Sequence, residues 1–256
     1  MKPKALILDA PGINCDEETY FAIEIAGGLP EYVMLSDIEK NPDIILKYKM
    51  LIMPGGFSYG DYISAGKIIS LILKKKLKDT LIEFIDKTNL LLGICNGFQI
   101  MVKANILPGE PYFSKQKVSL IQNDSKKFED RWVNLEVNKN SNCIFTKDIE
   151  KLYLPVAHGE GKFVTDNKVL NLLKEKNLVV LRYKIPDGKN SYPYNPNGSI
   201  DNIAGICDST GRIFGLMPHP ERYLIKEEHP LWTKGEYFEP TGKKIFKNAI
   251  EYLKQT

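Results

Sequence analysis

An apolar run that ends in a cysteine between two glycines constrains the fold of this chain most. Residues 90–92 are three consecutive leucines, and Gly93, Cys95 and Gly97 follow them. Such a run is typical of a buried parallel strand, and residues 98–102 can continue as a helix. Cys95 then lies on a sharp strand-to-helix turn, where side chains on either flank would collide with neighbouring backbone. The pattern predicts a nucleophile elbow that carries a thiol.

Apolar segments of strand length alternate with helical segments over much of the chain. The first strands are predicted at residues 5–8, 32–35 and 49–53, and the first helices at residues 16–26, 64–77 and 80–87. This alternation predicts an α/β fold with a doubly wound, mostly parallel sheet. Strands predicted at residues 118–121, 132–137 and 152–156 have no long helices between them, which indicates an antiparallel flap or extension of the sheet. The remaining predictions are a helix at 169–176, strands at 178–183, 203–207 and 213–217, a long loop at 186–199 and a final helix at 243–254.

Composition indicates an ordinary globular protein, and we expect a single domain over residues 1–256. The net charge is only +3, and the one dense basic run, residues 74–76, fits the solvated face of a helix. Nucleic acid is therefore not an expected partner. No apolar run approaches the roughly 18 residues that a membrane span needs, and no signal peptide is visible. The four cysteines show no spacing typical of zinc sites or disulfide frameworks, so a cytoplasmic protein without a metal site is expected.

A thiol nucleophile needs a base beside it, and His219 is the strongest candidate. Prolines on both sides keep its backbone extended, so the side chain two residues along, Glu221, points to the same side. The Glu221 carboxylate can accept a hydrogen bond from one ring nitrogen and leave the other to face the thiol. His158 lies in a glycine-rich turn and could line a site, whereas His229 lies in a charged stretch and is expected at the surface.

Each of these features also has a simpler interpretation. A buried free cysteine is usually a small core residue, although the flanking glycines favour the elbow for Cys95. The His-Pro-Glu segment could be a turn with an exposed ion pair. Residues 54–56, Pro-Gly-Gly, could be a plain turn, or their amides could form an oxyanion hole beside the nucleophile. Cys15, Cys143 and Cys207 lack a comparable setting and are interpreted as structural.

The order of several motifs resembles class I glutamine amidotransferases, which have a flavodoxin-like fold. The general motifs are PGGFSYGD at 54–61, GICNGFQ at 93–99 and PHPER at 218–222. Four more segments narrow the resemblance to the glutaminase subunits of phosphoribosylformylglycinamidine synthases. They are PGINCD at 11–16, residues 61–66, AHGEGKF at 157–163 and NPNGS at 195–199. The Gly-Gly and His-Pro-Glu signals are weak individually, but their order and number over nearly the whole chain make the set specific.

The resemblance implies a role for each matched residue. Cys95, His219 and Glu221 would form a catalytic triad that hydrolyses glutamine to glutamate and ammonia. The backbone amides of Gly56, Phe57 and Asn96 would form the oxyanion hole. The substrate-binding residues would be Gln99, which contacts the substrate amide, and His158 and Glu160, which line the glutamine site or its lid.

The resemblance also implies partners. Ammonia would pass to a large synthetase subunit, which converts formylglycinamide ribonucleotide to formylglycinamidine ribonucleotide, and a small accessory subunit is expected beside it. ATP and magnesium would bind that synthetase, because this chain shows no phosphate-binding loop and needs no cofactor.

Two positions depart from the family pattern, and some segments remain unmatched. Ile13 replaces an expected serine and Lys162 a common arginine, which affects only contacts at the interface or lid. Residues 227–239 receive no role.

Two other functions stay open from sequence: a non-catalytic regulatory module of the same fold, and a different cysteine enzyme such as a peptidase or a chaperone-like stress protein. Loss of a triad member would favour the first, and all three are present. The second would not require Gln99 or the 195–199 loop.

Overall fold

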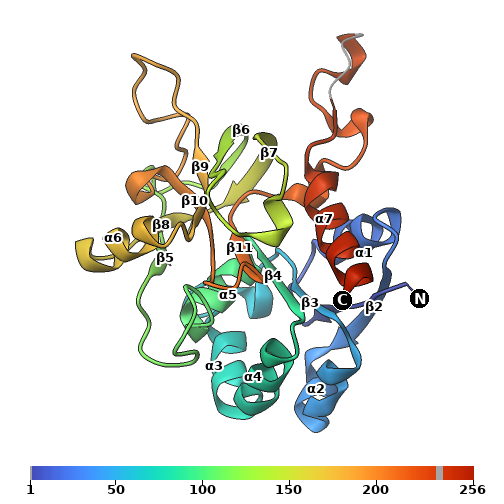
Figure 1. Cartoon of the computed structure of the whole chain (residues 1–256). Coiled ribbons are helices and arrows are strands. Elements are labelled where there is room, and N and C mark those ends of the chain that lie inside the picture. Colours follow the sequence, from blue (N-terminus) through green and yellow to red (C-terminus); the bar gives the residue numbers. More distant parts are fainter. Residues whose placement is uncertain (1, 235–238) are drawn as a thin grey trace.

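The computed structural model describes residues 2–234 and 239–256 and is built around a nine-stranded sheet. The strand order is β2-β1-β3-β4-β11-β10-β9-β6-β7. The strands of this sheet are β1 (Lys4–Asp9), β2 (Leu29–Met34), β3 (Met50–Met53), β4 (Leu90–Ile94), β6 (Glu129–Val137), β7 (Lys151–His158), β9 (Val179–Tyr183), β10 (Ile203–Cys207) and β11 (Ile213–Leu216). Figure 1 shows this sheet between two groups of helices.

One half of the sheet is parallel, and its three inner strands are fully buried. β2, β1, β3, β4 and β11 pair in parallel, and every residue of β3, β4 and β11 is buried. These strands are therefore continuous apolar runs rather than alternating ones. Leu216 pairs with Ile94, and Met53 pairs with Gly93. The carboxyl ends of three neighbouring strands thus meet at one edge, where α/β sheets place their functional loops.

The other half of the sheet is antiparallel. β10 pairs antiparallel with both β11 and β9, and β6 pairs antiparallel with β9 and β7. The predicted antiparallel extension is confirmed for β6 and β7. β5 (Ser119–Ile121) instead forms an antiparallel flap, because it lies outside the main sheet and pairs with the short strand β8 (Lys162–Val164). β8 lies in a glycine-rich segment where the sequence predicted a turn.

Helices cover both faces of the parallel half. α1 (Asp16–Ile25) and α7 (Gly242–Gln255) lie together on one face, and α2 (Leu35–Lys40), α3 (Lys67–Lys76), α4 (Lys78–Asp86) and α5 (Asn96–Ala104) lie on the other (Figure 1). α6 (Asn167–Glu175) precedes β9. The lysines at 74–76 occupy the last turn of α3 as predicted, where the helix dipole favours positive charge.

The sequence missed two short elements between β2 and β3. α2 and the 3-10 helix at Pro42–Lys47 were not predicted, because six-residue helices carry too little periodicity to be detected. Among the described residues, no helix has the length and apolarity required to cross a membrane.

Candidate functional site

Cys95 lies on a strained turn between β4 and α5. Its φ of 50° and ψ of −105° are rare for a residue with a side chain. Its amide donates to the Leu216 carbonyl at 2.8 Å, so the turn is tied to the neighbouring strand β11. The thiol lies 3.7 Å from the Ala157 carbonyl oxygen, and Cys95 is 5% exposed. The strand-to-helix elbow predicted from the sequence is confirmed.

The two elbow glycines are required by close backbone approach. A Cβ atom on Gly97 would lie 1.9 Å from the Met53 carbonyl oxygen at the end of β3. A Cβ atom on Gly93 would lie 2.3 Å from the Met101 sulfur and 2.8 Å from the Gly97 carbonyl carbon. Because these contacts are mostly with backbone, a side chain could not be accommodated without moving β3 or α5.

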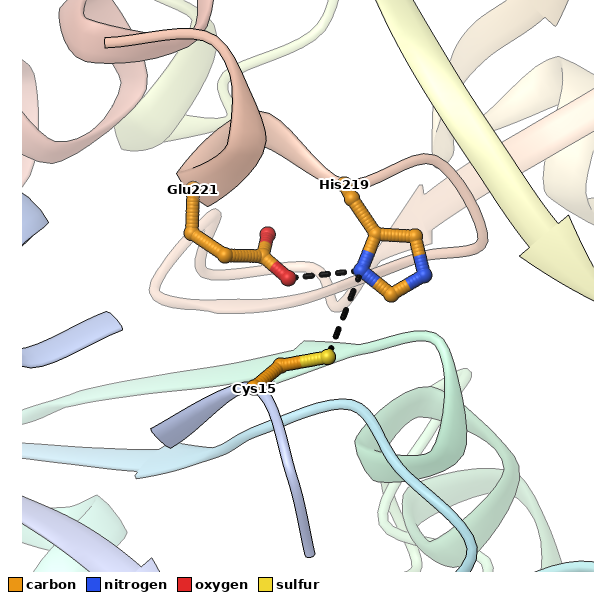
Figure 2. A group of neighbouring side chains, drawn as sticks. All are labelled: Cys15, His219 and Glu221. Carbon is orange, nitrogen blue, oxygen red and sulfur yellow. Dashed lines mark hydrogen bonds and ion pairs between the residues drawn. The ribbon is translucent and has the colours of Figure 1, made fainter. Parts of the chain in front are cut away.

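His219 follows β11 and reaches the same edge of the sheet as Cys95. Its amide donates to the Pro155 carbonyl at 2.9 Å, which fixes the segment against β7. Its Nδ1 lies 2.6 Å from Oε1 of Glu221 (Figure 2), and both side chains are buried. Nε2 lies on the opposite side of the ring and makes no hydrogen bond of normal geometry within residues 2–234 and 239–256.

The electrostatics of His219 favour an imidazolium. Burial lowers the pKa of His219, but the charge of the Glu221 carboxylate and the influence of the Cys95 and Cys15 thiols raise it well above its ordinary value. Cys95 thus acts electrostatically on the His219 ring. The arrangement suits a thiolate beside an imidazolium, with one carboxylate behind the ring.

A second thiol lies on the Glu221 side of the ring. Cys15 Sγ is 4.0 Å from His219 Nδ1 and accepts a hydrogen bond from Arg222 Nη2 at 3.1 Å. The sequence argument had interpreted Cys15 as structural and had not considered Arg222. The detectable signals were the place of Cys15 directly before a helix and that of Arg222 directly after Glu221.

Cys15, His219 and Glu221 offer three metal-ligating atoms within 4.8 Å of one another (Figure 2). The donor types would suit zinc. The Arg222 guanidinium, however, already contacts the sulfur and places a positive charge where a cation would bind. The chemistry of this cluster therefore fits a hydrogen-bonded network better than a metal site.

The loop predicted to supply oxyanion donors lies beside the elbow. Gly56 has a φ of 142°, and a Cβ atom there would lie 2.7 Å from the Gly12 carbonyl oxygen. The Phe57 amide donates to that same oxygen at 2.7 Å, so Phe57 is not free to bind an oxyanion in this structure. Asn96 begins α5, and its side-chain oxygen accepts from the Ser58 amide at 3.4 Å, which joins the elbow to this loop.

The Gln99 side chain is held on both sides. Its Nε2 donates to the Glu160 carbonyl at 2.6 Å, and its Oε1 accepts from Asn96 Nδ2 at 2.9 Å. Asn96 Nδ2 also donates to Asp61 at 3.2 Å, while the Glu160 carboxylate lies 3.8 Å from Lys103 Nζ. The sequence argument missed the roles of Asp61 and Lys103. Gln99 thus connects the elbow helix to the loop after β7, close to the thiol.

His158 is 2% exposed and lies among amide side chains. Nδ1 is 3.2 Å from Asn123 Oδ1, and Nε2 is 3.4 Å from Asn197 Nδ2. Burial, together with the nearby charge of His219, lowers the pKa of His158 to about 3. His158 is therefore a neutral ring that connects the loop after β7 to the 195–199 loop.

The prediction that His229 is a surface residue is wrong. It is 3% exposed, and its ring packs against Trp132, Tyr153 and Tyr223. The charged neighbours in the sequence concealed this aromatic environment. Of the unassigned stretch 227–239, residues 235–238 lie outside the described residues.

One hollow in the described part of the molecule lies away from this constellation. It has a volume of about 770 Å³ and is lined by the segment after β6 and by α7. No histidine lines it, so it lacks the groups needed for thiol chemistry. The site at Cys95, by contrast, is nearly closed to solvent.

Comparisons with known proteins agree with the site. A model of the CobB/CobQ-like glutamine amidotransferase domain matches residues 2–253. Phosphoribosylformylglycinamidine synthase subunit PurQ from Dehalococcoides mccartyi is 45% identical over 257 residues, with 99% of each chain covered. The same subunit from Methanococcus maripaludis is 41% identical, with 98% of this chain and 97% of the relative covered. A chain in the structure of PurLQS from Thermotoga maritima is 35% identical with a TM-score of 0.74, and the match covers 99% of this chain and 100% of that one. The chain therefore belongs to the PurQ family of class I glutamine amidotransferases.

Proposed function

We propose that this chain is the glutaminase subunit of a phosphoribosylformylglycinamidine synthase in purine biosynthesis. The observation that carries the proposal is the position of His219, with Glu221 2.6 Å from Nδ1 and a ring on which the Cys95 thiol acts electrostatically. All three residues lie at the carboxyl ends of neighbouring parallel strands or just after them, where α/β enzymes hold their chemistry. The full-length similarity to PurQ subunits supports this assignment.

The triad performs two successive reactions on glutamine. The Cys95 thiolate attacks the side-chain amide carbon, and the carbonyl oxygen takes the negative charge of the tetrahedral intermediate. The His219 imidazolium donates its proton to the leaving nitrogen, so ammonia departs and a thioester remains. Neutral His219 then takes a proton from water, hydroxide attacks the thioester carbon, and the C–S bond of the tetrahedral intermediate breaks. This restores the Cys95 thiolate and the His219 imidazolium, and glutamate leaves after its new carboxyl group loses a proton to solvent. Glu221 keeps Nδ1 protonated and stabilises the imidazolium.

The neighbouring groups have supporting roles in this proposal. The Asn96 amide, at the start of α5 and directly after the nucleophile, is one oxyanion donor, and the helix N-terminus adds favourable partial charge. Gly56 and Phe57 are the others, and Phe57 contributes once its hydrogen bond to Gly12 breaks. Gln99 contacts the substrate amide, while His158 and Glu160 line the glutamine site through the loop after β7.

A synthetase partner would use the ammonia. The relatives are named as synthase subunits, and one solved relative is part of PurLQS. By the same relation, a large subunit that binds ATP and magnesium and a small accessory subunit complete the enzyme, and the cytoplasm is the expected location.

The loop beside the site carries three large exposed side chains, Phe57, Tyr62 and Ile63, and Ile63 is 86% exposed. Such a patch is typical of a protein interface.

The proposal is tested by glutamate release from glutamine, measured with and without the synthetase subunits. We expect activity to rise when the partners are added, and Cys95→Ala to lose at least about a thousandfold in kcat. Cys207→Ala is the matched control, since Cys207 is also a buried free thiol but lies in β10. Unchanged glutamate release by Cys95→Ala would overturn the proposal.

A further inference from the structure

The thiol of Cys15 contacts the edge of the imidazole that carries Nδ1. Cys15 Sγ lies 4.0 Å from His219 Nδ1, the atom that also binds Glu221 at 2.6 Å. Figure 2 shows the sulfur and the carboxylate approaching this one nitrogen from different directions. Cys15 is 1% exposed and Glu221 is 0% exposed, so water does not compete for these contacts.

Cys15 is held in place by Arg222. Arg222 Nη2 donates to the sulfur at 3.1 Å, and Arg222 Nε lies 3.7 Å from Glu18 Oε1 on α1. The sulfur is thus fixed between a cation and the imidazole. Burial raises the pKa of Cys15, which keeps this thiol protonated and unsuited to nucleophilic attack.

The same part of the chain also packs against the ring through Gly55. The amides of Asn14 and Cys15 both approach the Gly55 carbonyl oxygen, at 3.4 and 3.3 Å. A Cβ atom on Gly55 would lie 2.8 Å from His219 Cε1 and 3.1 Å from Cys15 Sγ. The Nδ1–Cε1 edge of the imidazole is therefore enclosed by Gly55 and Cys15, and this side of the ring has little room to move.

We infer that Cys15 is a positioning residue which, held by Arg222, fixes the His219 ring so that its free nitrogen faces Cys95. The inference rests on the proposed triad but adds a contact outside it. The sulfur is a weak second acceptor for the Nδ1 proton and a polarisable packing surface for the ring. Glu221 alone leaves the ring free to pivot about a single hydrogen bond, whereas two contacts define its plane.

The test compares Cys15→Ala, Cys15→Ser and the control Cys143→Ala, which removes another buried free thiol. In the complete synthase, we expect Cys15→Ala to lower kcat for glutamine about tenfold with KM changed less than twofold, because the ring is misplaced in the transition state. Cys15→Ser should retain at least a third of the parent kcat, because its hydroxyl keeps both contacts. Parent-like kcat in Cys15→Ala would overturn the inference.

A second readout follows the thiolate directly. Alkylation of Cys95 by iodoacetamide, assigned by peptide mass mapping, is measured against pH. In Cys15→Ala we expect the half-maximal rate to move at least half a pH unit upward, because a misplaced imidazolium stabilises the Cys95 thiolate less. A packing defect alone would leave this midpoint unchanged, so an unchanged midpoint also contradicts the inference.

A variant of the holding residue covers the case in which Cys15→Ala does not fold. Arg222→Gln should shift the same alkylation midpoint upward, because the Cys15 sulfur loses the guanidinium that holds it. An unchanged midpoint in Arg222→Gln would overturn the inference. The proposed function is tested separately, since it fails only if Cys95→Ala remains active.

Discussion

The elbow at Cys95 and the N-terminal loop at Cys15 hold two buried thiols that both act on the His219 imidazole, in different settings. Cys95 has a left-handed φ, begins a helix and faces a backbone carbonyl. Cys15 has an ordinary φ of −111° and faces a guanidinium. The comparison shows that strained backbone and the choice of ring nitrogen, rather than proximity to a histidine, separate a nucleophile from a positioning group.

Among the changes that test this comparison, we expect the substitution of Glu221 to lower kcat most. Glu221→Gln removes the charge that stabilises the imidazolium and can hold His219 in the wrong tautomer, so kcat should fall about a thousandfold. Glu227→Gln, a change of an exposed carboxylate away from the ring, is the control. If Glu221→Gln lowered kcat less than tenfold, the contact of Glu221 with His219 Nδ1 would contribute less to catalysis than the geometry indicates, and the comparison would fail.

Crowding the enclosed edge of the ring should have an intermediate effect. Gly55→Ala places a methyl group 2.8 Å from His219 Cε1, so the ring must shift and kcat should fall about tenfold. The loss should be no greater in a Cys15→Ala background, because the ring is already displaced there. Steady-state kinetics of the single and double variants, with thermal unfolding in parallel, measure this. A parent-like Gly55→Ala would show that the edge is loosely packed.

A third histidine gives the smallest effect, which is on stability rather than on rate. Burial and the nearby charge of His219 lower the pKa of His158 to about 3, so below the unfolded value of about 6.5 the unfolded chain binds a proton that the folded chain does not. Stability should fall as the pH falls from 6.5 towards 3, by up to about 1.4 kcal/mol per pH unit from this residue.

His158→Gln should remove this component and flatten the slope below pH 6.5. Urea unfolding at several pH values, for parent and variant, measures the difference. If parent and variant showed the same dependence of stability on pH, His158 would be protonated in the folded protein. The His158 and His219 rings would then both carry a positive charge.

The parallel half of the fold and the residues proposed as a triad were within reach of sequence analysis. The leucines at 90–92 and the prolines around His219 are local signals, and parallel strands bring their carboxyl ends together by topology. The order of the motifs indicated the family and, through it, the roles of the other site residues. β8 was missed because three residues carry almost no periodicity, and whether β5 forms a flap or extends the main sheet depends on its pairing with β8.

Other features depend on contacts that a sequence does not display. Cys15 lies beside His219 because its amide donates a hydrogen bond to the Gly55 carbonyl after β3 and its sulfur accepts one from Arg222. His229 was predicted at the surface from its charged neighbours, but three aromatic rings from distant segments surround it. Such arrangements follow from tertiary packing rather than from local pattern.

The position of β11 in the sheet has a consequence for biosynthesis. β11 lies between β4 and β10, yet it is the last strand of the sheet along the chain. Until residues 213–216 have been synthesised, β4 has a bare apolar edge, and the Cys95 amide lacks its acceptor on Leu216. We therefore expect a nascent chain that lacks these residues to be inactive and to expose an unpaired strand edge.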